Sequence, residues 1–233
     1  CEIVGLSDGP SSASDVAFRL APRINAPGRL GDASEALFLL IETDQRKARQ
    51  HAENCNDLNT RRQEVQEVVL REAREQVEAQ LRQGNPEVLV TAARGWHAGV
   101  VGIVAAKLVD TYDRPAVVIA LDDESGRGSA RSAHDFHMYQ GLQEAAPLLL
   151  RYGGHAAAAG LSVHMDQIDA VRETLCLSYR RQLGGQIPRR VTNVDATVGL
   201  EEVDERLAQE ISLLEPFGIA NTEPLLLSRD AEV

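Results

Sequence analysis

The 233-residue sequence has few cysteines and few aromatic residues, which make up 4% of the chain. Cys1, Cys55 and Cys176 are odd in number, far apart and in no Cys-x-x-Cys pair. Neither a disulfide framework nor a zinc knuckle is therefore expected. The two internal cysteines lie in helical patterns and are predicted to be small buried apolar residues. This cysteine usage favours a reducing, cytoplasmic location.

Long apolar runs and targeting signals are also missing. No stretch approaches the roughly 20 apolar residues that a transmembrane helix needs. The opening residues, CEIVGLSDGP, show no basic region followed by an apolar run, and the first residue is not Met. We therefore expect a piece of a longer protein with no membrane partner.

Common catalytic signatures are absent as well. The sequence has no Walker A loop, no HExxH, no GxSxG and no Asp-rich cluster with metal-ligand spacing. His134, Asp135 and His137 suggest a metal site, but Asp135 at a helix start is better explained as a cap. No metal ligand is predicted in this chain.

Excess positive charge is missing too, since the formal net charge is -11. An acidic chain does not coat nucleic acid by bulk electrostatics. Nucleic-acid binding would need a local cluster of arginine, histidine and backbone amides.

The remaining sequence divides into four regions. Residues 1–32 form an irregular leading segment. Residues 33–83 contain no proline or glycine and repeat apolar residues at helical spacing, which predicts a long connector helix, with Thr43 and Asp44 able to restart it as two helices in series. Residues 84–184 predict an α/β domain, and residues 185–233 begin a unit too short to bury its own core, either truncated or donating a strand elsewhere.

The 84–184 region is expected to contain a central, mainly parallel sheet flanked by helices. Residues 87–93 and 115–122 predict buried strands around a helix at 100–112, an arrangement that implies a parallel unit. A helix at 135–152, a small-residue turn, a short strand and a helix at 165–183 should follow. Gly184, Gly185 and residues 188–190 predict a linker.

Two clusters in the first half of the chain could bind anions. Arg23 and Arg29 flank a Pro-Gly turn that can present guanidinium groups to a phosphate, although solvated arginines on a structural turn are the simpler explanation. Trp96 and His97 lie in a small-residue loop after the first strand, where parallel α/β folds collect ligands. A tryptophan that merely anchors the core explains that loop equally well.

Two further clusters follow in the second half. GRGSARS, residues 126–132, combines glycines, hydroxyls and arginine as a phosphate-binding loop does, with a plain surface turn as the alternative. His155 follows two glycines and precedes four alanines, so its imidazole should protrude from backbone that other groups can approach closely. That setting favours a functional histidine over an incidental surface one.

In this order, the motifs resemble the RecJ exonucleases of the DHH phosphoesterase superfamily. The resemblance rests on APRINAPGRLGDA, GWHAGVVGIVAAKL, GSARS, YGGHAAAAGL and LEPFGIANTEP, and spans roughly residues 21–224. Two departures are Pro27-Gly28, where the family usually has Ala-Gly, and Ile-Ala-Asn-Thr-Glu-Pro after LEPFG, in place of a more usual Gly-Asn-Pro-Glu-Pro.

The resemblance implies a single-stranded-DNA-specific 5′–3′ exonuclease that hydrolyses phosphodiesters in DNA repair and recombination. Its Mn²⁺ or Mg²⁺ ligands would precede this chain. Residues 1–32 would then come from the catalytic domain, 33–83 form the connector helix, 84–184 form the DHH-associated substrate-binding domain, and 185–233 begin an oligonucleotide-binding domain. Single-stranded DNA would be the main partner. The longer protein that contains this chain would also bind single-strand-binding protein and a helicase.

The resemblance also assigns roles to residues. His155 should contact the scissile phosphate, with Gly153 and Gly154 giving close access. Arg131, Ser129 and Ser132 should hold the phosphate backbone, and Arg29, with Arg23, should bind a phosphate near the entrance. Trp96 and His97 would form the site wall or packing.

Two alternatives remain open. One is an oligoribonuclease or cyclic-dinucleotide phosphodiesterase of the same superfamily, although the long helix and the LEPFG segment favour RecJ. The other is a nucleic-acid-binding module without catalysis. We expect the isolated chain to lack metal-dependent nuclease activity and to bind single-stranded DNA weakly, with strong salt dependence.

Overall fold

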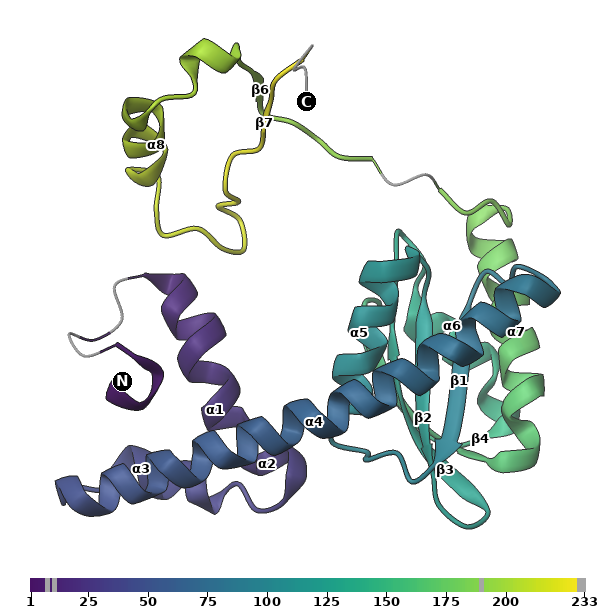
Figure 1. The fold of residues 1–233 in the computed structure, drawn as a ribbon. Coiled ribbons are helices and arrows are strands. Elements are labelled where there is room, and N and C mark those ends of the chain that lie inside the picture. Colours follow the sequence, from purple (N-terminus) through teal and green to yellow (C-terminus); the bar gives the residue numbers. More distant parts are fainter. Residues whose placement is uncertain (7–8, 10–11, 189–190, 230–233) are drawn as a thin grey trace. The chain divides into compact units, whose positions relative to one another are not determined.

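The computed structural model describes residues 1–6, 9, 12–188 and 191–229 (Figure 1). The chain divides into two units: one is Arg23–Pro188, and the other comprises Cys1–Pro22 and Arg189–Val233. Residues 189–190 of the predicted linker lie outside the described residues, as do 7–8 and 10–11 of the leading segment and 230–233 of the final one. Within the described residues, no helix is long and apolar enough to cross a membrane.

Helices and strands alternate through the described residues. The α-helices are α1 (Ala21–Asn25), α2 (Pro27–Leu30), α3 (Ser34–Ile41), α4 (Gln45–Gln83), α5 (Val101–Tyr112), α6 (Met138–Glu144), α7 (Ile168–Leu183) and α8 (Glu205–Ser212). The other helical turns are η1 (Glu2–Val4), η2 (Asp15–Leu20), η3 (Ala146–Leu148), η4 (Met165–Gln167) and η5 (Leu200–Glu202). The strands are β1 (Leu89–Arg94), β2 (Ala116–Leu121), β3 (Ser125–Arg131), β4 (Leu149–Gly154), β5 (Ala158–His164), β6 (Ala196–Thr197) and β7 (Leu226–Leu227).

The predicted long helix is confirmed as two helices in series. Asp44 caps α4, because its side chain accepts hydrogen bonds from the Arg46 and Lys47 amides at 3.0 Å each. The helix ends at Gln83, immediately before the Gly84-Asn85-Pro86 stop signal. One stripe of α4 is buried: Cys55, Asn59, Arg62, Gln66, Val69, Leu70, Ala73 and Val77.

The prediction of a mainly parallel sheet is wrong. The five strands are ordered β1-β2-β3-β5-β4, and within that sheet β1 and β2 pair in parallel while the other pairs are antiparallel. Only residues 122–124 separate β2 from β3, and so short a connection can join neighbouring strands only as an antiparallel hairpin. The helix predicted over 135–152 is also wrong in its second half, since Pro147 lies in η3 and the chain then continues as β4.

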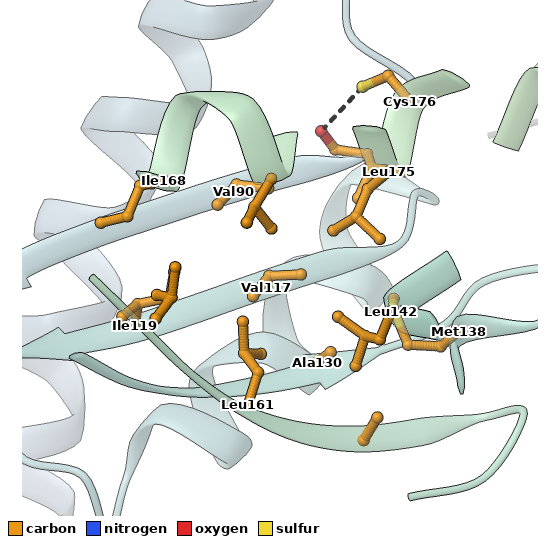
Figure 2. Close-up of a cluster of buried hydrophobic side chains, with 14 of the residues drawn as sticks. Val90, Val117, Ile119, Ala130, Met138, Leu142, Leu161, Ile168, Leu175 and Cys176 are labelled. Atoms are coloured by element: carbon orange, nitrogen blue, oxygen red, sulfur yellow. Dashed lines mark hydrogen bonds between the residues drawn. The ribbon is translucent and has the colours of Figure 1, made fainter. Parts of the chain in front are cut away.

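Both faces of the sheet pack against helices (Figure 1). On one face, β1 and β2 meet α4 and α5 in a cluster that includes Val69, Val77 and Leu108. On the other face, α6 and α7 cover a second cluster (Figure 2), in which the Cys176 thiol lies 3.8 Å from the Val88 carbonyl oxygen. Each fully buried Val, Leu or Ile side chain contributes about 1.5–3 kcal/mol, so these two clusters hold the five-stranded sheet between its helices.

The outer edge of β1 is closed by two glutamines of α4. Gln76 donates to the Ala92 carbonyl at 3.0 Å and accepts from the Ala92 amide at 3.1 Å. Gln80 makes the same pair of contacts with Val90, at 2.7 and 3.4 Å. Side-chain amides thus satisfy backbone groups that a neighbouring strand would otherwise bind.

The second unit contributes small elements on either side of the larger one in sequence. In residues 191–229, β6 and β7 form a two-stranded parallel pair, and Asp204 caps α8 through the Leu207 amide at 2.8 Å. In residues 1–22, Arg19 forms an ion pair with Asp15 at 3.1 Å and also donates to the Val4 carbonyl.

Candidate nucleic-acid interface

Strand β3 divides its side chains between two environments. Gly126, Gly128 and Ala130 face the cluster under α6 and α7, where a Cβ on Gly128 would lie 3.0 Å from Ile119 and Leu161 atoms. Because side chains alternate along a strand, Arg127, Ser129 and Arg131 lie on the opposite face. The polar residues of the GRGSARS motif therefore share one surface.

Arg131 is fixed against the first turn of α5. Its Nη1 donates to Ser129 Oγ and to the Ala130 carbonyl oxygen, each at 2.9 Å. A Cβ on Gly102 would lie 3.1 Å from Ser129 Oγ and 3.2 Å from Arg131 Nη2. Gly102 thus leaves room for the guanidinium, and no carboxylate of the described residues forms an ion pair with it.

The Arg29 segment meets the same turn of α5. A Cβ on Gly99 would fall 1.8 Å from the Arg29 carbonyl oxygen, so the two backbones touch where only glycine fits. Arg29 Nη1 lies 3.4 Å from the Gly99 carbonyl oxygen, to which it donates. The structure therefore brings together two predicted motifs that lie 70 residues apart, and it places Arg29 and Arg131 beside residues three positions apart at the start of α5.

Three other residues predicted to bind a ligand, Arg23, Trp96 and His97, form hydrogen bonds with nearby groups. Arg23 Nε donates to Asn56 Oδ1 of α4 at 2.9 Å. Trp96 is buried, and its indole donates to Glu72 Oε2 of α4 at 2.7 Å. His97 is exposed and accepts the Gly99 amide through Nδ1 at 3.0 Å. These contacts explain how the loop is held, while a role in ligand binding stays a prediction for all three.

A hollow lies at the carboxyl ends of β1 and β2. It has a volume of about 610 Å³ and is lined in part by His97, Asp122 and Arg127. Arg131 and His155 do not line it.

His155 lies in the turn between β4 and β5, at the end of β3 that carries Arg131. Its backbone amide donates to the Ala158 carbonyl at 2.8 Å, and its side chain is exposed. Gly154 has φ of 142°, and a Cβ there would lie 2.5 Å from Ala159 Cα, so the turn needs glycine. The Ser132 amide donates to the Ala157 carbonyl at 2.8 Å, which holds the turn beside the end of β3.

Ser132 differs from Ser129 in where its hydroxyl points. The Ser132 hydroxyl donates to the Phe136 carbonyl oxygen. That contact explains how the segment after β3 is closed. Phosphate binding by Ser132 stays a prediction, and it would require this hydroxyl to exchange partners.

Cross-strand rows extend the polar surface beyond β3. Ser129 lies opposite Gly160, which lies opposite Gly153, and a Cβ on Gly153 would meet nothing within 4 Å. In the neighbouring row Arg127 lies opposite Ser162, which lies opposite Arg151. Directly opposed residues share a face, so these two rows and Arg131 form the surface that we call the arginine face: Arg127, Ser129, Arg131, Arg151, Gly153, Gly160 and Ser162.

Arg127 and Arg151 belong to this surface, although neither was among the binding residues predicted from the sequence. Arg127 lies within the quoted GRGSARS motif, and strand alternation would have grouped it with Arg131. Arg151 precedes the predicted turn, and its place depends on the pairing of β4 with β5. Neither arginine forms an ion pair with a carboxylate of the described residues. The acidic chain thus has the local cationic cluster that nucleic-acid binding requires.

Comparison with known proteins connects these motifs to one family. The DHHA1 domain family matches residues 85–178, and the RecJ OB domain family matches residues 194–233. The single-stranded-DNA-specific exonuclease RecJ of Bacillus subtilis (strain 168) is 36% identical over 236 residues, covering 99% of this chain and 30% of that protein. The chain is homologous to a segment of RecJ. The RecJ resemblance seen in the sequence is thereby confirmed.

Solved RecJ structures share this fold. The crystal structure of RecJ in complex with Mg²⁺ from Thermus thermophilus matches with a TM-score of 0.83 and 34% identity, covering 97% of this chain and 34% of that one. The structure of the same protein in complex with Mn²⁺ matches with the same TM-score and identity. The chain thus spans about a third of the length of the RecJ proteins that it matches.

The metal ions of those RecJ structures have no matching ligand set among the residues described in this structure. Among the residues that the structure describes, no three His, Cys, Asp or Glu side chains gather so that they could hold a metal ion. These described residues therefore do not fit a metal centre.

Proposed function

We propose that this chain is the single-stranded-DNA-binding part of a cytoplasmic exonuclease that hydrolyses phosphodiesters from the 5′ end. The observation that carries the proposal is the arginine face, on which three arginines without ion-pair partners among the described residues surround small residues. RecJ relatives named as single-stranded-DNA-specific exonucleases support the choice of substrate. Mn²⁺ or Mg²⁺, which related structures contain, would be held by residues outside this chain.

The arginine face suits a flexible phosphate backbone. Guanidinium groups bind phosphate oxygens through paired N–H donors, and Arg131 is braced by Ser129 so that little freedom is lost on binding. The row Ser129–Gly160–Gly153 is low enough for the sugar-phosphate chain to approach the sheet. Arg29 and Arg131 would each hold a phosphate beside the first turn of α5, where backbone amides also favour anions.

His155 is proposed to contact the scissile phosphate. Its imidazole is exposed at the end of the arginine face, in a turn whose geometry Gly154 fixes. There it would stabilise negative charge that develops on the phosphoryl oxygens.

The test uses the full-length protein that contains this chain, assayed on 5′-phosphorylated single-stranded DNA with Mn²⁺. His155→Ala should lower the rate by about 10²–10³-fold, the range found when one transition-state donor is removed, while DNA binding persists. His164→Ala removes another exposed histidine of the same sheet face, at the far end of β5, and should lower the rate far less than His155→Ala. Full activity of His155→Ala would remove His155 from the mechanism.

A second assay uses the 233-residue chain alone. It should bind single-stranded DNA with strong salt dependence and show no metal-dependent nuclease activity. Manganese-stimulated degradation by this chain would contradict the proposed division of labour. Activity of the full-length protein on dinucleotides but not on long DNA would point instead to an oligoribonuclease or cyclic-dinucleotide phosphodiesterase.

A further inference from the structure

Arg62 is a buried arginine in the middle of α4. It is 9% exposed. Its Nη1 donates to Gln66 Oε1 at 2.7 Å, and its Nη2 donates to Asn59 Oδ1 at 2.8 Å. Asn59 and Gln66 lie three residues before and four residues after it, so all three share one side of the helix. The helix itself clamps the guanidinium with two neutral amides.

The charge of Arg62 has no counterion among the described residues. None of their carboxylates forms an ion pair with it. The nearest acid in its hydrogen-bond network is Glu67, which accepts from Gln66 Nε2 at 3.3 Å but already pairs with Lys107 at 3.0 Å. Buried arginines are normally paired, because an isolated buried charge is costly.

Arg62 lies close to the segment that carries Arg29. Helix α2 packs against α4, and Arg23 anchors the start of this segment to Asn56, six residues before Arg62. Burial lowers the pKa of the Arg62 guanidinium, and the positive charge of Arg29 lowers it further. The two like charges therefore repel each other.

We propose that Arg62 is a positioning residue of the nucleic-acid interface. Its clamped charge repels the Arg29 guanidinium and raises the positive potential where Arg29 meets a DNA phosphate. A phosphate bound at Arg29 is the counterion that Arg62 lacks, so binding relieves the repulsion present in the free protein. This inference rests on the function proposed above.

The test separates charge from packing in the 233-residue chain. Arg62→Gln keeps hydrogen-bonding groups for Asn59 and Gln66 but removes the charge, whereas Arg62→Lys keeps the charge. Affinity for a 5′-phosphorylated oligothymidylate is measured by fluorescence anisotropy over a range of KCl concentrations, and thermal unfolding is recorded in parallel. Arg61→Gln is the matched control, because it makes the same change at an exposed neighbour on the same helix.

Arg62→Gln should weaken binding about threefold to tenfold at low salt and flatten the dependence of log K on log salt. Arg62→Lys should restore most of the affinity and most of the salt dependence. Arg61→Gln should change affinity by less than about twofold, as expected for an exposed, screened charge. A structural role predicts instead that both Arg62 variants lower the melting temperature while the folded protein binds normally. That result, or an equal loss in Arg61→Gln, would overturn the proposal.

Arg131→Ala distinguishes failure of this inference from failure of the proposed function. If Arg131→Ala loses binding and Arg62→Gln does not, the inference about Arg62 alone is wrong. If the unaltered chain does not bind the oligonucleotide in a salt-dependent way, the proposed function fails, and the inference fails with it.

Discussion

Over β1 and β2, the sheet face toward α4 and α5 is apolar and buried, whereas over β3, β5 and β4 the same face is half-buried or exposed and carries arginine, serine and glycine. The covered half, over β1 and β2, includes Leu89 and Val118, both fully buried. The open half, over β3, β5 and β4, is the arginine face. The same face of the sheet therefore packs into the core over β1 and β2 and presents arginine side chains over β3 and β4.

The difference shows how β3 can serve both purposes at once. Gly126, Gly128 and Ala130 pack toward Ile119 and Leu161, so the opposite face of β3 need not contribute to the core. Strand alternation then frees Arg127 and Arg131 for binding. Substitutions in the two halves should consequently have separable effects, with stability changing in one and affinity in the other.

The largest expected effect is on stability in the covered half. Leu108 of α5 is fully buried, and Leu108→Ala should lower the free energy of unfolding by about 2–5 kcal/mol, the range for buried leucines. Urea denaturation followed by circular dichroism measures this change. In buffer without urea, where the variant is folded, its affinity for single-stranded DNA should match that of the unaltered chain. A parallel loss of affinity would mean that the two halves are coupled.

The next effect is on affinity in the open half. Arg131→Ala should weaken single-stranded DNA binding by about 1.5–3 kcal/mol, the range for hydrogen bonds to charged groups, and lower the salt slope by about one phosphate contact. The free energy of unfolding should change by no more than about 1.5 kcal/mol, the range for a lost hydrogen bond, because Arg131 also donates to Ser129 and Ala130. Anisotropy titrations at several salt concentrations test this, with Arg82→Ala as a control on the last turn of α4. A stability loss equal to that of Leu108→Ala would make Arg131 a packing residue.

A third change probes the outer edge of the covered half. Gln76→Ala removes both hydrogen bonds to Ala92 and should lower stability by about 1–3 kcal/mol, because two part-buried backbone groups lose their partners. Hydrogen exchange at the Ala92 amide should accelerate far more than exchange at the Val117 amide, inside the sheet. Unchanged exchange at Ala92 would show that the glutamine does not close the strand edge.

Local signals in the sequence were enough to predict the covered half. The absence of glycine and proline over 33–83, the cap at Asp44 and the stop at Gly84 follow from backbone chemistry within a few residues. The strand, helix and strand over 87–122 were likewise visible from their apolar runs. The motifs proposed to bind DNA were visible too, because glycine-rich arginine and histidine segments are unusual.

The open half could not be predicted because its strands depend on distant partners. SGRGSAR has no β-branched residue and is typical of a loop. It is a strand because Gly126 and Gly128 make room for Ile119 and Leu161, and because β2 and β5 flank it. Arg62 was overlooked for another reason: it lies seven residues after Cys55 and seven before Val69, so helical spacing places it on the buried stripe, but a charged side chain is normally expected to be exposed.

The smallest expected effect concerns the ion pair between Glu87, just before β1, and Arg180 of α7. The Glu87 carboxylate is buried and accepts hydrogen bonds from Arg180 Nε at 2.6 Å and from Arg180 Nη2 at 3.1 Å. Burial raises the pKa of the Glu87 carboxyl, but the Arg180 hydrogen bond and charge outweigh it, so the net pKa lies below its ordinary value of 4.5. A carboxyl with a lowered pKa stabilises the fold above its unfolded pKa, and that contribution disappears as pH falls through the folded value.

Glu87→Gln should therefore cost stability at pH 7, by no more than about 1 kcal/mol because Arg180 is half exposed. The difference from the unaltered chain should shrink once the pH falls below 4.5 and the wild-type carboxyl takes up its proton. Urea denaturation at several pH values between neutral and acidic conditions measures it, with exposed Glu173→Gln on α7 as the control. If Glu87→Gln were equally destabilising at every pH, the pair would act through packing and hydrogen bonding rather than charge. Single-stranded DNA binding at pH 7 should be unaffected in either case, because the ion pair joins α7 to the start of β1, apart from the arginine face.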